Sequence, residues 1–192
     1  MKTIDARGLP CPKPVMMARE AVRDGADALC VAVDNEVSAS NVTRFLENEG
    51  FAVTREGSAE EILLRSIREK QAAPPAASRE EAPAYLILSR TLGSEDLELG
   101  ELLMKSFLGT VAAGKPLPRA VALMNGGVRL AMEDSSCSET LRELECEGVL
   151  ILVCGTCAKH FGVMDRIVVG QISNMFEITS AVFEAEKPIV LG

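Results

Sequence analysis

Three cysteines stand in contexts whose residue types and spacing suit chemistry. Cys11 lies between two prolines in the run LPCPKP (residues 9–14), and Cys154 and Cys157 form a Cys-Gly-Thr-Cys segment. A thiolate is a nucleophile and a metal ligand, and it can hold a transferable sulfur atom as a persulfide. The chain has six cysteines, at positions 11, 30, 137, 146, 154 and 157, but only one histidine. Its candidate chemistry is therefore thiol chemistry.

The proline-flanked Cys11 is placed to be reactive. Pro12 suits the first position of a helix, which needs no N–H donor, so a helix over 12–22 would put Cys11 at or near its N-cap. The helix dipole lowers the pKa of a thiol there, and Arg7 and Lys13 add positive charge. Residues 1–70 contain no histidine, which excludes a Cys–His hydrolase in this part. Two interpretations of Cys11 remain: a thiolate that accepts sulfur, or a small apolar residue in a proline-rich turn.

Cys154 and Cys157 follow a predicted strand over 149–153. A zinc site would need His160 as a third ligand and Cys137 or Cys146 as a fourth, although Cys146 falls at the far end of the same strand. A redox dithiol and a persulfide site with one resolving thiol are the other chemical readings, with Lys159 and His160 favouring the thiolate. Two buried strand-end cysteines are the alternative without chemistry. We expect no resident metal.

A glycine pair follows another predicted strand, over 119–124. Asn125, Gly126 and Gly127 could form a small backbone nest that binds an anion. The segment lacks the glycine spacing of a Walker or dinucleotide motif, and a tight turn is the simpler reading.

Composition restricts the partners. The 192 residues carry a net charge of −8 with pI near 4.8, which argues against nucleic acid and against an anionic membrane surface. No apolar run approaches the length of a spanning helix, and the first residues contain no signal-peptide core. We expect a cytoplasmic protein whose thiols stay reduced.

The elements that must position these cysteines fall into two domains, 1–70 and 85–192, joined by a Pro- and Ala-rich linker over 71–84. Hydrophobic patterning in the first domain predicts βαβαββ, a two-layer α+β sandwich. Its expected strands are 2–5, 29–33, 51–55 and 62–67, with helix as an alternative for the last, and its helices are 12–22 and a segment that Ser38 or Ser40 caps and that runs to Glu49.

The second domain alternates strands and helices, which predicts a parallel sheet with helices on both faces. The expected strands are 85–89, 119–124, 149–153 and 188–191, and the expected helices are 96–112, 138–147 and 174–184. Sites in such sheets lie at the carboxyl ends of the strands. Residues 91–96, 125–128 and 154–161 fall there.

The first 70 residues resemble the TusA/SirA family of small sulfur-carrier proteins. The resemblance rests on the run DARGLPCPKP (5–14), which contains the Cys-Pro-x-Pro motif of Cys11, Pro12 and Pro14, and on the βαβαββ order. It implies that Cys11 carries the transferable sulfur, supported by Arg7 and Lys13.

The segment from Tyr85 onward resembles the DsrE/F-like family, a flavodoxin-like parallel sheet found in sulfur-relay proteins. The matching pieces include MNGGV (124–128), CGTC (154–157) and VGQISNM (169–175). The two domains together resemble the YedF-like proteins, which are associated with selenium metabolism. By that match Cys154 and Cys157 are the candidate thiols of the second domain.

We therefore hypothesise a sulfurtransferase-like carrier. Cys11 would accept sulfane sulfur or selenium from a cysteine desulfurase-type donor and pass it to Cys154 or Cys157, or to another relay protein. The only cofactor would be the transient cysteine persulfide, and the second domain would assemble into a homo-oligomer. A zinc- or partner-binding regulatory module and a dithiol–disulfide oxidoreductase are the alternatives.

Overall fold

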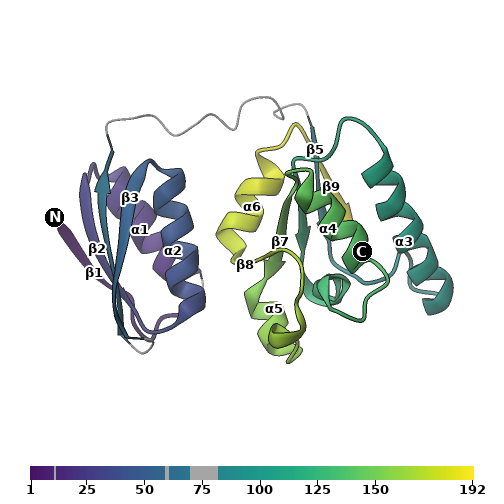
Figure 1. The fold of residues 1–192 in the computed structure, drawn as a ribbon, viewed down its shortest axis with the longest axis horizontal. Helices are drawn as coiled ribbons and strands as arrows, with labels where there is room; N and C mark the ends of the chain where they lie inside the picture. The colour runs from purple at the N-terminus through teal and green to yellow at the C-terminus, as the bar shows by residue number, and fades with distance from the viewer. Residues whose placement is uncertain (11, 59–60, 70–81) are drawn as a thin grey trace. The chain divides into compact units, whose positions relative to one another are not determined.

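The computed structural model describes residues 1–10, 12–58, 61–69 and 82–192 (Figure 1). The chain divides into two compact units, Met1–Ala77 and Ser78–Gly192, each of which is described by itself. The expected linker 71–84 lies outside the described residues except for its last three. A strand begins at Pro83, so the first strand of unit 2 is Pro83–Ile87 rather than 85–89.

Unit 1 has the expected βαβαββ order. Its sheet runs β1-β2-β4-β3, with β1 parallel to β2 and the other pairs antiparallel. The elements are β1 (Lys2–Asp5), α1 (Lys13–Arg23), β2 (Ala28–Val33), α2 (Glu36–Asn48), β3 (Phe51–Ser58) and β4 (Glu61–Arg68).

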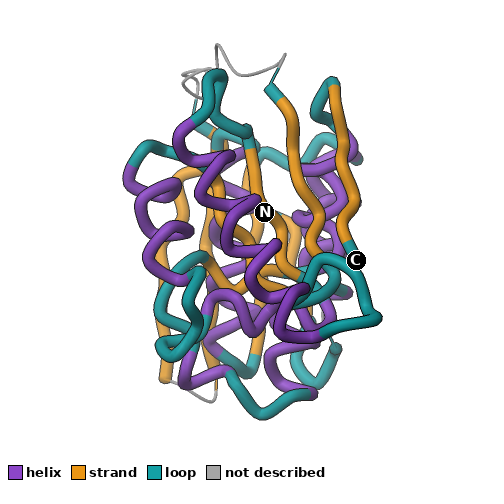
Figure 2. The backbone as a smooth tube through the Cα atoms, turned by 90° about the vertical axis from the view of Figure 1, so that its right-hand side faces the viewer, coloured by secondary structure: helices purple, strands orange, loops and turns teal. Residues whose placement is uncertain are grey.

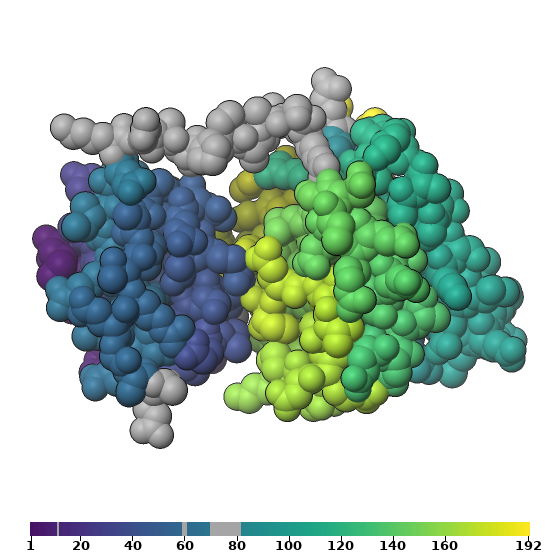
Figure 3. Space-filling model, viewed as in Figure 1, coloured from purple at the N-terminus to yellow at the C-terminus, as the bar shows by residue number. Residues whose placement is uncertain are grey.

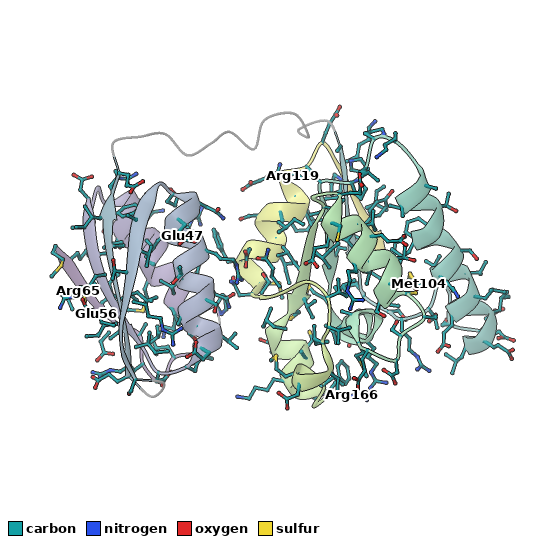
Figure 4. All side chains as sticks on the ribbon, in the orientation of Figure 1. Glu47, Glu56, Arg65, Met104, Arg119 and Arg166 are labelled. Atoms are coloured by element: carbon teal, nitrogen blue, oxygen red, sulfur yellow. The ribbon has the colours of Figure 1, made fainter. Side chains whose placement is uncertain are left out.

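Apolar periodicity explains how the layers of unit 1 meet. α1 buries Val15 and Ala18 and packs on β1 and β2, whereas α2 buries Val42 and Leu46 and packs on β3 and β4. β4 alternates buried and exposed residues, which confirms a strand rather than the alternative helix. On the hairpin of β3 and β4, Arg65 and Glu56 pair at 2.9 Å, and Figure 4 labels both.

Both helices of unit 1 begin differently from the expectation. Pro12 is the N-cap of α1 rather than its first helical residue. Asn35, not Ser38 or Ser40, caps α2, because its side chain accepts a hydrogen bond from the Ser38 N–H at 2.9 Å.

Unit 2 is a parallel five-stranded sheet in the order β8-β7-β6-β5-β9. α6 packs on β5, β6, β7 and β9, and α3 and α4 lie on the other side of the sheet (Figures 1 and 2), as in a flavodoxin-like domain. The elements are β5 (Pro83–Ile87), α3 (Leu97–Ala113), β6 (Ala120–Leu123), the 3₁₀ segment η1 (Asn125–Ala131), α4 (Ser138–Cys146), β7 (Leu150–Cys154), α5 (Gly155–His160), the 3₁₀ segment η2 (Met164–Arg166), β8 (Gln171–Ser173), α6 (Met175–Phe183) and β9 (Lys187–Leu191).

The core of unit 2 forms around its central strands. All four residues of β6 are buried, as is typical of a strand covered on both faces. Met104 and Leu108 anchor α3 in the core, and Figure 4 labels Met104. Four other leucines of α3 stay exposed on the surface of this helix, drawn in teal in Figure 3: Leu97, Leu99, Leu102 and Leu103. Among the described residues, no helix is long and apolar enough to span a membrane.

Candidate thiol site

Cys11 lies outside the described residues, but the segments on either side of it are placed. Lys13 begins α1 with its side chain exposed, and Pro14 is buried in the second position of the helix. The Lys13 N–H donates to the Pro10 carbonyl oxygen at 2.9 Å, which links the described residues on the two sides of position 11. The motif prolines thus fix the start of α1.

Arg7 is engaged by carboxylates. Its guanidinium contacts Asp5 at 2.8 Å and Glu61 at 2.8 Å. The hydrogen bonds from Arg7 hold the pKa of Asp5 down to about 2. The next residue, Gly8, has a φ of +69° and donates its N–H to Asp34 at 2.6 Å. Arg7 is therefore tied to the end of β1 and to the start of β4, and its charge is largely balanced by these two partners.

Cys154 and Cys157 sit at the junction of β7 and α5. Cys154 is the last residue of β7 and the N-cap of α5, and its side chain is 4% exposed. Cys157 lies one turn later and is half-buried. The two thiols are free cysteines at the carboxyl end of the sheet, one enclosed and one partly open to solvent.

The environment of Cys154 disfavours its thiolate. Burial is the largest cause, and a hydrogen bond with the Cys157 side chain adds to it, so the pKa of Cys154 rises to about 11. The backbone N–H groups of Cys157 and Thr156 act in the opposite direction but do not cancel the rise. Near neutral pH Cys154 is a protonated thiol beside the Cys157 sulfur.

The predicted Asn125–Gly127 segment lies against Cys157. The Asn125 N–H donates to Cys157 Sγ at 3.2 Å, and Asn125 has a φ of +47°. Gly127 donates its N–H to the carbonyl oxygens of Leu88 and Met124, so this N–H already has partners. A Cβ on Gly127 would lie 2.2 Å from the Ile87 oxygen, which explains why glycine occupies this close approach.

The other expected ligands are distributed differently. His160 is exposed at the end of α5, and its ring packs edge-on against Phe161 with centroids 5.1 Å apart. Cys137 is 2% exposed because it packs in the core at the start of α4. Cys146 is exposed at the end of that helix. No three His, Cys, Asp or Glu side chains cluster to hold a metal ion within the described ranges.

Patterning missed the neighbouring strand β8. Its Ser173 pairs in register with Cys154 and donates to Glu177 at 2.6 Å. Asn174 caps α6 by accepting from the Glu177 N–H, and its buried Nδ2 has no hydrogen-bond partner in the described part of the chain. The sequence Asn-x-x-Glu is a capping-box pattern that marks the start of α6. It could have indicated that the residues just before it, Gln171–Ser173, form a strand.

We compared the chain with known protein families and solved structures. Residues 2–65 match the family model described as sulfurtransferase TusA. The chain is similar to a SirA-like protein from Desulfitobacterium hafniense, with 32% identity over 35% of this chain and 96% of that one, at a TM-score of 0.33. It is also similar to the YchN protein of E. coli, with 14% identity over 57% of this chain and 99% of that one, at a TM-score of 0.44.

The family match covers β1, α1, β2, α2, β3 and most of β4, and it includes the LPCPKP run. The fold of unit 1 and this match point to the same conclusion. The N-terminal part of the chain, residues 2–65, is a TusA/SirA-like sulfurtransferase domain.

Proposed function

We propose that the chain is a sulfur-relay protein whose first acceptor is Cys11. TusA-family proteins take sulfur from a desulfurase-type donor and pass it to acceptors. The Cys11 thiolate would attack the outer sulfur of the donor's persulfide. The donor's S–S bond then breaks, the donor thiolate leaves, and Cys11 holds the sulfur as a persulfide. The single observation that carries the proposal is the family match, which includes the motif around Cys11.

The supporting residues divide into two roles in this proposal. Lys13, exposed in the first turn of α1, supplies positive charge near a Cys11 thiolate. Arg7 instead has a structural role: its guanidinium binds Asp5 and Glu61, and these bonds hold the chain around residue 7 in place. Pro12 and Pro14 fix the start of α1.

Of the two thiols at the end of β7, we assign Cys157 as the next sulfur acceptor after Cys11. Its sulfur is half-buried rather than enclosed, and it accepts a hydrogen bond from the Asn125 N–H. The Cys157 thiolate would attack the outer sulfur of the Cys11 persulfide, which releases the Cys11 thiolate and leaves the persulfide on Cys157. Cys154, kept protonated by its burial, would donate a hydrogen bond to that sulfur rather than compete for it.

The same displacement can transfer selenium, because a selenium atom can replace the outer sulfur of the persulfide to give R–S–Se⁻. We therefore include selenium among the possible cargoes. We interpret unit 2 as a DsrE-like domain and the whole chain as YedF-like, with the relay placed in the cytoplasm, where thiols stay reduced.

Loading with ³⁵S-cysteine and a cysteine desulfurase tests the first step. We expect the wild-type chain to retain label that a reductant releases, and Cys11→Ser to lose it. Cys146→Ser is the matched control, because it removes an exposed thiol at the end of α4. Equal labelling of Cys11→Ser and the wild type would refute Cys11 as the first acceptor.

The exposed leucines of α3 support a further part of the proposal, self-association through unit 2. Leu97, Leu99, Leu102 and Leu103 expose an apolar surface along one helix. Sedimentation analysis of Leu102→Glu, with the exposed Glu98→Gln of the same helix as control, tests it. We expect the leucine variant alone to shift toward monomer, and a wild-type chain that is monomeric at micromolar concentration would contradict self-association.

A further inference from the structure

A cleft of about 510 Å³ lies in unit 2, close to Cys154 and Cys157 but lined by neither. Its walls come from segments that follow the carboxyl ends of β5, β6 and β7, where parallel sheets place their ligands. Its volume falls in the range of small-molecule sites. Figure 4 labels Arg166, one of its lining residues.

Among the side chains that line the cleft, basic groups outnumber acidic ones, in a protein that is negative as a whole. Three arginines line it, Arg90, Arg129 and Arg166, against two carboxylates, Glu101 and Asp134. The whole chain has the opposite balance, with 20 basic and 28 acidic side chains. Each arginine comes from a different strand-end segment, so their convergence results from the fold and not from a run of basic sequence.

The arginines are available to a ligand to different degrees. Arg90 pairs with Glu101 at 3.2 Å, and Arg166 pairs with Asp134 at 2.7 Å and with Glu133 at 3.5 Å. These ion pairs are exposed, and exposed pairs contribute little to stability. A bound anion can therefore share the arginine with its carboxylate or replace that carboxylate. Arg129 lies over the Phe161 ring at 4.8 Å and has no carboxylate partner in the part of the chain that the structure describes.

We propose that this cleft binds a small molecule through an oxyanion group, with Arg129 as the principal contact and Arg90 and Arg166 on either side. A guanidinium offers paired N–H donors to two oxygens of one carboxylate, sulfonate or phosphate group. Ser135 and Ser136, which also line the cleft, add hydroxyl donors just before α4. The phenyl ring of Phe161 holds the Arg129 guanidinium from one side.

The cleft and the Cys157 thiol are connected through α5 and its C-cap Phe161 and through η1. The Phe161 N–H bonds to the Cys157 carbonyl oxygen, so the two residues lie on the same side of α5 about 6 Å apart along its axis. On η1, Asn125 contacts Cys157 and Arg129 contacts Phe161. An oxyanion-bearing molecule in the cleft could therefore present its other end toward Cys157. This second step rests on the proposed sulfur relay, whereas the binding step does not.

Isothermal titration with sulfate, thiosulfate and phosphate, each added to the full chain in low-salt buffer, tests the binding step. We expect saturable binding of at least one probe. Arg129→Ala should weaken it about tenfold or more, the loss typical of one charge-assisted hydrogen bond, and Arg129→Lys should fall between. Arg142→Ala is the matched control, because Arg142 lies on α4 outside the cleft and bonds the Val168 carbonyl.

The outcomes separate this inference from the relay. Cys157→Ser should bind the probes as the wild type does, because the thiol is not part of the anion contact. Absence of saturable binding, or equal affinities of Arg129→Ala and Arg142→Ala, would overturn the cleft assignment and leave sulfur loading on Cys11 untouched. Loss of sulfur loading with intact probe binding would overturn the relay and leave the cleft.

Discussion

Gly127 is the position at which one added methyl group tests the construction of the thiol site. A Cβ there would lie 2.2 Å from the Ile87 backbone oxygen, and real Cβ atoms essentially never come closer than 3.0 Å. In Gly127→Ala, η1 and the end of β5 must therefore separate by at least 0.8 Å. The movement strains the bond from the Met124 N–H to Ile87 and that from the Gly127 N–H to Leu88.

The size of the effect follows from two opposed contributions. Overpacking against fixed backbone costs about 1–3 kcal/mol, and a Gly to Ala change returns about 0.5–1 kcal/mol through the unfolded chain. We expect a net loss of about 1–2 kcal/mol in the free energy of unfolding, or roughly 0.5–1 M in the urea midpoint of unit 2. Gly126→Ala is the matched control, because the nearest atom to its Cβ would lie 3.7 Å away.

Urea unfolding followed by circular dichroism measures the midpoints, and alkylation followed by peptide mapping measures the reactivity of Cys157. Displacement of η1 moves the Asn125 N–H away from Cys157 Sγ, so we expect slower alkylation of Cys157 near neutral pH in Gly127→Ala only. If Gly127→Ala and Gly126→Ala unfold at the same urea concentration, the close approach of η1 to β5 is wrong.

Three further predictions concern charge and capping. Because burial raises the pKa of Cys154 from 9.0 to about 11, the folded state keeps a proton that the unfolded state loses, and stability should fall between pH 9 and 11 by at most roughly 2–3 kcal/mol. Cys154→Ser should flatten that decline in urea titrations across this range, and an unchanged slope would contradict the burial of the thiol. In Arg7→Ala the pKa of Asp5 should rise from about 2 toward its ordinary value, as carboxyl NMR would detect, and a constant pKa would mean that Arg7 is not its partner. Asp96→Ala should cost about 1 kcal/mol of stability because it removes the bond to the Leu99 N–H, and Asp96→Asn should retain most of it; equal losses in thermal unfolding would count against the cap.

Long hydrophobic patterns predicted most of the fold. The order of unit 1 and the parallel alternation of unit 2 follow from strands and helices long enough to show their periods. β8 has only three residues and α5 only six, so neither completes a recognisable pattern. The strand Pro83–Ile87 was predicted two residues too late, at 85–89, because the prolines and alanines before it are typical of a linker.

The site was predictable in its residue types but not in its contacts. The sequence marked Cys154, Cys157 and Asn125 separately, and the fold brings Asn125 to Cys157 from a position 32 residues away. The engagement of Arg7 by Glu61 spans 54 residues and leaves no local signal. Burial of Cys137 likewise depends on how α4 packs, which the surrounding serines do not reveal.

Intact-protein mass spectrometry with peptide mapping, after incubation with a cysteine desulfurase and cysteine, tests the relay most directly. A time course on the wild-type chain should show an adduct of one sulfur mass first on the peptide that contains Cys11 and later on the peptide that contains Cys157. In Cys11→Ser the second adduct should disappear with the first. An adduct on Cys157 that forms equally fast without Cys11, or no adduct on either peptide, would contradict the relay.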